Sequence, residues 1–118
     1  MRMWATDPKF MCRKHLLGEH VEMHMFVGTL RRGISIKGYI NNNLIQPIDI
    51  LIRHDLLVTE MERRGYNHKS PMYEGEIKEL LQQLPEKIRY HDMDLEKSEE
   101  ELMSRCLDCR ARKDKEER

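Results

Sequence analysis

The sequence predicts an all-α protein, a compact single-domain bundle of about three to five helices with short connections. Composition is the first reason, since 36% of the 118 residues are charged, 6% are aromatic and nine are methionine. A β-sandwich would use more valine, threonine and aromatic residues. The second reason is that apolar residues recur with the period of an α-helix. We expect one domain over residues 1–112 and a charged, frayed end at 113–118.

The first predicted helix begins near Asp7-Pro8 and runs to about Arg32. Aspartate is a good N-cap and proline suits the first helical position. Gly33 can end the helix in the left-handed conformation. The apolar stripe that should face the core contains Leu16, Met23, Val27 and Leu30.

Pro47 opens a second predicted helix, after a connection at residues 33–46 that is rich in glycine and asparagine. Arg63 and Arg64 occupy its last turn and Gly65 follows it, which is the usual pattern at a helix C-terminus. Its apolar stripe contains Ile50, His54, Leu57 and Met61.

Two further helices are predicted, over residues 76–84 and 95–112, and Pro85 stops the first of them. No run of about 18 apolar residues exists, so we expect no membrane span. Three cysteines, an odd number, and the absence of a signal-peptide pattern indicate a reduced, cytoplasmic setting. We expect a monomer.

Charge is unevenly distributed although the whole chain has a net charge of zero. Residues 1–73 hold 11 Lys/Arg and 7 Asp/Glu, a net charge of +4, whereas residues 74–118 hold 10 and 14, a net charge of −4. The first part could therefore face an anion such as nucleic acid. Ordinary scatter of surface charge is the alternative.

A second stripe on the first helix lies away from the core stripe and contains His15, Gly18, Glu22 and Thr29. Two of these residues are small, so a ligand would have room to lie along the helix beside a histidine and a glutamate. A solvated face that happens to contain a glutamate is the alternative.

Two blocks, "HLLGEHVEMHMFVGTLRR" (15–32) and "RHDLLVTEMERRGYNH" (53–68), together with the opening "MRMW", resemble the phage-type pyrimidine-dimer DNA glycosylase/AP lyase family. The resemblance implies a phage or bacterial setting and damaged double-stranded DNA as the partner. It also implies that the α-amine of Met1 is the nucleophile and that Glu22, 21 positions later, is the catalytic carboxylate.

The chemistry implied by the resemblance is an imine between the α-amine and deoxyribose C1′, followed by β-elimination. An α-amine has a reference pKa of about 7.7–8, so a useful fraction is neutral near physiological pH, which favours a Schiff base. No metal is needed. Val21 and Met25 stand where the family's well-studied form has arginines, so the sequence leaves the lesion open between pyrimidine dimers and abasic sites. A non-catalytic helical module that binds DNA or protein is the alternative function.

Basic residues that could meet phosphates form the predicted DNA-binding set, and four of them also fall on matching family positions (Arg2, His15, Arg31 and Arg32). For each residue alone, solvated surface charge is an equal alternative. The set is Arg2, His15, Arg31, Arg32, Arg63, Arg64 and Lys69.

We expect no cofactor, but one alternative is a structural zinc site. Cys12-x-x-His15 and Cys106-x-x-Cys109 have the ligand types and local spacing of zinc sites. The favoured interpretation is that the two tail cysteines are small core residues on an apolar stripe. The pair His20 and His24, and His54 on the second helix, are interpreted as packed histidines rather than metal ligands.

Overall fold

The computed structural model describes residues 1–68 and 70–117, and the described residues form helices and no strands, which confirms the all-α, single-domain prediction. The seven α-helices are Arg13–Arg31 (α1), Lys37–Asn41 (α2), Ile50–Arg63 (α3), Glu74–Gln82 (α4), Glu86–Arg89 (α5), Leu95–Arg105 (α6) and Leu107–Glu116 (α7). Two 3₁₀ turns, Pro8–Phe10 (η1) and Pro47–Asp49 (η2), precede α1 and α3. None of the helices in the described ranges combines the length and apolar character of a bilayer span.

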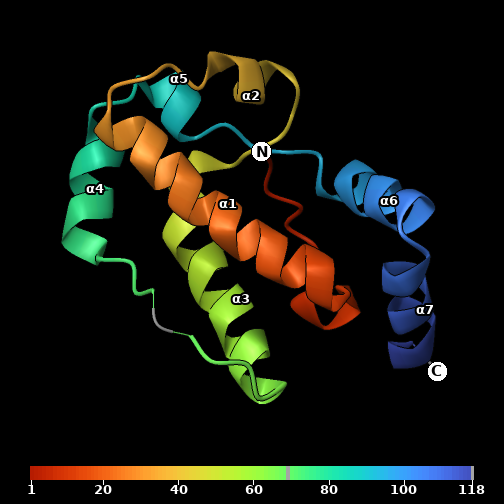
Figure 1. Ribbon diagram of the computed structural model, residues 1–118. Helices are drawn as coiled ribbons and strands as arrows, with labels where there is room; N and C mark the ends of the chain where they lie inside the picture. Colours follow the sequence, from red (N-terminus) through yellow and green to blue (C-terminus); the bar gives the residue numbers. More distant parts are fainter. Residues whose placement is uncertain (69, 118) are drawn as a thin grey trace.

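The long helix α1 lies at the centre of the molecule and packs on α3, with α4 and α5 on one side and α6 and α7 beyond the other (Figure 1). Both predicted apolar stripes are buried: Leu16, Met23, Val27 and Leu30 on α1, and Ile50, His54, Leu57 and Met61 on α3. Burying these two stripes against each other is the main hydrophobic contribution to the fold.

Gly33 and Gly65 end the two long helices as predicted. Their φ angles are +70° and +83°, a conformation that a residue with a Cβ adopts only under strain. Asp7 caps η1 rather than α1, because Met11 and Cys12 turn inward in an extended conformation and are buried before α1 begins. The chain between η1 and α1 therefore belongs to the core.

The helices outnumber the predicted three to five for three reasons. The expected connection at 33–46 contains the short α2, the short α5 follows Pro85, and the expected last helix is broken at Cys106, which has φ −124° and ψ 107°. Cys106 ends α6 and caps α7, so the chain changes direction there (Figure 1). Helix α7 continues to Glu116, four residues past the expected end of the domain at 112.

A buried ion pair joins α1, α3 and the N-terminal segment. The Arg53 guanidinium of α3 donates to both carboxylate oxygens of Glu19 on α1 and, at 2.7 Å, to the Thr6 carbonyl. The side chains of Glu19 and Arg53 are 0% and 6% exposed. Each charge satisfies the other, and removing one would leave the other buried without compensation.

Candidate active site

The first residues of the chain form an extended segment that backbone contacts fix against the rest of the molecule. The Met3 N–H donates to the Leu44 carbonyl at 2.7 Å. The Ser98 hydroxyl of α6 donates to the Trp4 carbonyl at 2.6 Å. The side chains of Met3 and Trp4 are buried in the core. The chain terminus is thereby held on both sides, beside the middle of α1 (Figure 1).

Arg2 strengthens this anchoring with its side chain. Its guanidinium donates to Ser98 Oγ and to Glu101 Oε2, each at 3.0 Å, and its Cζ lies 3.7 Å from the centroid of the Trp4 ring. The hydrogen bond from Arg2 holds the pKa of the Glu101 carboxyl below its usual range. The side chain of Arg2 is only 12% exposed. Arg2 is thus tied to α6 and lies mostly out of solvent.

Glu22, halfway along α1, faces the anchored terminus. The backbone N–H of Arg2 donates to Glu22 Oε2 at 3.3 Å, and the Glu22 side chain is half-buried. The Met1 α-amine is a few covalent bonds from that N–H. Within residues 1–68 and 70–117, no carboxylate forms an ion pair with the amine itself. The structure therefore brings the carboxylate next to the terminus and leaves the amine unpaired by acids of the described chain.

A groove of about 510 Å³ opens beside Met1, and we call it the amine groove. It combines the chain terminus with two arginines, two small residues and an aromatic ring. Tyr39 packs edge-on against Phe26, with ring centroids 5.1 Å apart. The residues that line the groove are Met1, Met25, Gly28, Thr29, Arg31, Arg32 and Tyr39. Of the predicted second stripe of α1, Thr29 lines this groove, whereas His15, Gly18 and Glu22 do not.

The family profile of pyrimidine dimer DNA glycosylases matches residues 1–74, more than half of the 118-residue chain.

The chain belongs to this family. A DNA-repair glycosylase kind of function, with DNA as the substrate, follows from that membership. The matched region contains Met1, Glu22 and all of α1 and α3, whereas α6 and α7 lie outside it. No curated protein and no solved structure matches the chain significantly.

The predicted DNA-binding residues of this glycosylase family member lie in different surroundings. Arg31 and Arg32 are exposed beside the amine groove, and Arg31 pairs with Glu76 of α4 at 2.5 Å. Arg63 is 53% exposed and pairs with Glu60. Lys69 lies outside the described residues.

Arg64 is the least exposed arginine of that set for which a side-chain exposure is known. Its side chain is 8% exposed and donates to Glu60 and, at 3.0 and 2.7 Å, to the carbonyls of Pro8 and Met11. Three of the five guanidinium N–H groups are therefore used within the chain, and little of the side chain reaches solvent. Arg64 therefore connects α3 to η1. Arg2 is likewise mostly buried and bonded to α6, and the predicted DNA contacts of both residues stay predictions.

Sequence reasoning missed three residues that surround the chain terminus and the amine groove. Tyr39 follows Gly38 in the segment that was expected to be only a connection, and the one available signal was an aromatic residue in a polar stretch. Ser98 and Glu101 carried no signal, because they hold the N-terminus from about a hundred residues away.

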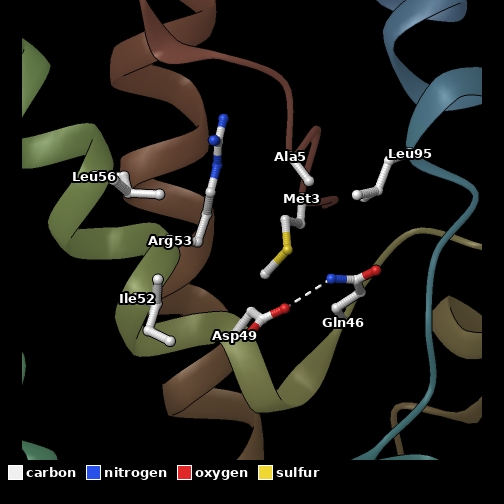
Figure 2. Close-up of a pocket in the computed structure, with 8 residues that line it drawn as sticks. All are labelled: Met3, Ala5, Gln46, Asp49, Ile52, Arg53, Leu56 and Leu95. Atoms are coloured by element: carbon white, nitrogen blue, oxygen red, sulfur yellow. Dashed lines mark hydrogen bonds between the residues drawn. The ribbon is translucent and has the colours of Figure 1, made fainter.

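A second hollow, of about 220 Å³, lies between α3 and the N-terminal segment (Figure 2). It is mostly apolar, with Ile52, Leu56 and Leu95 on its walls. The polar groups that reach it are already bonded. Gln46 Nε2 donates to Asp49 Oδ2 at 2.7 Å (Figure 2), and Arg53 binds Glu19. No nucleophile lines it, so the amine groove is the better candidate for the glycosylase site.

Cys12, His15, Cys106 and Cys109 converge at one place, and we call them the sulfur cluster. Cys12 caps α1 and Cys106 caps α7, each Sγ accepting from the N–H three residues later. This local geometry points the side chains of Cys12 and His15 toward the same place, and likewise those of Cys106 and Cys109. The four donor atoms lie within 4.8 Å of one another.

Distances within the sulfur cluster suit a tetrahedral metal ion. Cys12 Sγ lies 3.8 Å from Cys106 Sγ, and His15 Nδ1 lies 3.7 Å from Cys109 Sγ and 3.2 Å from Cys12 Sγ. Zinc–sulfur bonds of about 2.3 Å place tetrahedral ligands about 3.8 Å apart. The four residues could thus hold a metal ion. A buried Cys109 fits both the interpretation of the tail cysteines as core residues and the interpretation of a zinc site. Only the zinc interpretation requires the donor atoms of all four residues to converge.

Burial dominates the electrostatics of this cluster. It lowers the pKa of His15, with the Lys14 charge adding to the effect, and it raises the pKa of the Cys109 thiol to about 12. Burial would also raise the pKa of Cys106, but hydrogen bonds from the Cys109 and Asp108 backbone and the neighbouring thiols outweigh it and lower that pKa. His15 thus turns Nδ1 toward thiols, and its predicted contact with DNA stays a prediction that competes with this role.

The histidines interpreted as packed residues are indeed packed: His20 and His54 are buried and His24 is half-buried. The structure adds His68, from the segment after α3, and brings one nitrogen of each of the four rings within 4.8 Å of the others. We call these four residues the histidine cluster. Burial, followed by the charges of the other three rings, lowers the pKa of His20 to about 4. No sequence pattern links His68 to the other three histidines.

Proposed function

We propose that the protein is a DNA-repair glycosylase with AP lyase activity on damaged duplex DNA, that the Met1 α-amine is its nucleophile, and that Glu22 is its catalytic carboxylate. The observation that carries the proposal is the hydrogen bond from the Arg2 N–H to Glu22, which keeps the terminus beside the carboxylate. The anchoring of Arg2, Met3 and Trp4 supports it further, because a fixed nucleophile loses less entropy on reaction.

In the proposed reaction the neutral amine attacks deoxyribose C1′, the N–C1′ bond forms, and the glycosidic bond to the base breaks. Opening of the sugar ring yields an iminium ion, and the ring oxygen and departing base take up protons. Glu22 stabilises the cation and removes a proton from C2′. The electron pair of the broken C2′–H bond then expels the 3′ phosphate, which cuts the strand. Water hydrolyses the imine and so releases the amine. Every step uses groups of this chain, DNA or water.

The amine groove supports a flipped nucleotide as the substrate. Its volume of about 510 Å³ is enough for one nucleotide beside the amine. Tyr39 and Met25 offer apolar surface to a base, whereas Arg31 and Arg32 offer charge to its phosphates. Damaged pairs cost less to open than intact ones, which favours lesions over normal DNA. Met25, which is 50% exposed, replaces an expected arginine, so apolar contact replaces charge at this point.

We further propose that the sulfur cluster binds a structural Zn²⁺. Its tetrahedral distances and three thiols support zinc over harder ions. The bound ion would join the start of α1 to α7, and so hold the C-terminal helices against the segment that carries the amine. Its role would be in folding and positioning, with no step of the reaction passing through the metal.

The proposal is tested by trapping with borohydride. The full chain with its free N-terminus is incubated with duplexes that contain an abasic site or ultraviolet damage, and the reductant converts any imine into a stable amine. We expect a covalent protein–DNA adduct on Met1, located by mass spectrometry. An uncleaved N-terminal extension should abolish it, since the amine is then an amide.

Glu22→Gln should form the adduct slowly and lower strand cleavage by at least about 100-fold. Glu79→Gln, an exposed carboxylate on α4, is the matched control and should cleave normally. Absence of any adduct with both substrates would refute the enzymatic proposal and favour the non-catalytic DNA-binding module. Cleavage of abasic DNA alone would keep the lyase step and exclude dimer specificity.

A further inference from the structure

We propose that His20, His24, His54 and His68 form a second metal site, which takes one divalent transition-metal ion through four imidazole nitrogens. The site is separate from the sulfur cluster and goes beyond the proposed glycosylase activity. Two of its residues lie on α1, one lies on α3, and one lies in the segment that follows α3. Imidazole nitrogens suit Zn²⁺, Cu²⁺, Ni²⁺ and Fe²⁺. The four imidazole ligands are neutral, so the ion would be the only charged group among the ion and its ligands.

The arrangement of the four rings is the one that a tetrahedral ion imposes. Five of the six ring pairs have centroids between 4.8 and 5.4 Å apart, and four of these five pairs are steeply inclined to each other, at 63–89°. Nitrogens about 2.0 Å from a central zinc place ring centroids about 3.2 Å from it, and therefore about 5.2 Å from one another. A small contraction of the donor atoms, which already lie within 4.8 Å, would complete the coordination.

Unused nitrogens are the second, independent observation. The Nε2 atoms of His20, His24 and His68 are buried and have no hydrogen-bond partner. A buried polar atom without a partner costs free energy, and three of them together would be an unusual concentration of that cost. A metal ion at the centre would satisfy these three nitrogens, which have no other partner within the described residues. Edge-to-face packing alone explains the inclined rings but leaves these nitrogens unsatisfied.

His54 has the outer partner that metal-bound histidines commonly have. Its Nδ1 lies 2.9 Å from Asp55 Oδ1, so Nδ1–H donates to the carboxylate and Nε2 is left as the ligand atom. In the structure that Nε2 lies 3.2 Å from the Ser70 carbonyl, a contact it would exchange for the metal. The carboxylate of Asp55 is largely exposed, so it orients the ring without entering the site.

The position of the site indicates a structural role. His20 and His24 lie about 180° around α1 from Glu22, as the angle of about 100° per residue requires. A metal there is on the opposite side of the helix from the amine and cannot touch a substrate bound beside Glu22. It would instead fasten the segment around His68 to α1 and α3.

The test counts metal ions and identifies their ligands in the purified full chain. Metal-depleted protein is titrated with Co²⁺ and followed by absorption, because only thiolate ligands give charge-transfer bands while any tetrahedral site gives d–d bands. We expect about two equivalents to bind. The equivalent bound by the sulfur cluster should give both charge-transfer and d–d bands. The equivalent bound by the histidine cluster should give d–d bands alone.

The double variant His24→Asn/His68→Asn should lose the equivalent that lacks charge transfer and bind about half as much Co²⁺ or Zn²⁺ as the wild type. His91→Asn is the matched control, because His91 is half-buried and its Nε2 is also unpartnered, but it lies outside the cluster. It should keep both equivalents.

The proposal is overturned if the wild type shows no d–d absorption beyond that of the thiolate site, or if the double variant binds as much metal as the wild type. The titration of the wild type decides this even if the double variant fails to fold. Adduct formation with DNA does not enter the readout, so failure of the histidine site and failure of the glycosylase proposal are distinguishable.

Discussion

Glu19 and Glu22 lie one turn apart on α1, and their surroundings assign them different roles. Glu19 is buried and compensates the charge of Arg53, which itself is nearly inaccessible to solvent. Glu22 is half-buried and faces the chain terminus. The same substitution at the two positions should therefore give opposite results, with one changing stability and the other changing activity.

Glu19→Gln leaves Arg53 charged and buried without its partner, so the free energy of unfolding should fall by about 3–5 kcal/mol. Glu22→Gln keeps an oxygen that can accept from the Arg2 N–H, so its unfolding free energy should change by less than about 1 kcal/mol while cleavage is lost. Urea unfolding and single-turnover strand cleavage measure the two effects. Equal destabilisation by both substitutions would contradict this division of roles.

The sequence could predict Glu22 but could not separate it from Glu19 on physical grounds alone. The two residues are about 60° apart around the helix and neither lies on the apolar stripe, so periodicity alone does not assign them different roles. What distinguishes them is Arg53, 34 residues further along the chain, and Arg2 at the terminus. The pairing of Met1 with Glu22 was implied only by resemblance to the family, and what the structure adds is the 3.3 Å contact between the Arg2 N–H and Glu22 Oε2.

At the scale of elements, α7 is joined to the start of α1 through the sulfur cluster. The backbone N–H of Cys12 lies 3.2 Å from Cys109 Sγ, and η1 packs against α7. The sequence predicted one continuous last helix because its apolar spacing runs through residue 106 without a break. The break arises from the Cys106 side chain capping α7, a contact made favourable by partners on the other end of the chain.

If zinc occupies the sulfur cluster, its removal should loosen α7 while leaving α1 and α3 folded. We expect trypsin to cut after Arg110 or Arg112 about ten times faster in chelator than in zinc, because cleavage needs local opening of α7. The measurement is made in the His24→Asn/His68→Asn background, so that only the sulfur cluster responds to metal.

Two variants of α7 complete the comparison. Cys109→Ser should be cut rapidly with or without zinc, and Leu107→Ala, which alters an 83% exposed side chain in the same turn, should keep the protection by zinc. If trypsin cleaves at the same rate in chelator and in zinc, the cysteines pack as ordinary core residues, which is the interpretation that the sequence favoured.

At the scale of the whole molecule, the acidic second half has a use that its composition did not reveal. Glu101 and Glu99 of α6 bind Arg2 and Thr6, so the acidic part of the chain holds the N-terminal segment in place. Few basic residues of the predicted DNA-binding set are then left exposed, and two of them, Arg31 and Arg32, line the amine groove. Of the predicted DNA-binding set within the described residues, Arg31, Arg32 and Arg63 are the exposed arginines, whereas Arg2 and Arg64 are used internally.

A small number of phosphate contacts should give DNA binding a shallow dependence on salt. Three arginines would release about three counterions, so the slope of log Kobs against log salt concentration should be roughly −2 to −3 for an uncleavable abasic-site analogue. Arg32→Gln should make the slope shallower by about 0.9, because it removes one contact beside the groove. Arg110→Gln removes an equally exposed arginine from α7, where it pairs with Asp114, and should leave the slope unchanged. Equal effects of the two substitutions would mean that DNA binding depends on the net charge of the protein rather than on the arginines beside the amine groove. The proposal that the DNA strand lies along the amine groove would then be wrong.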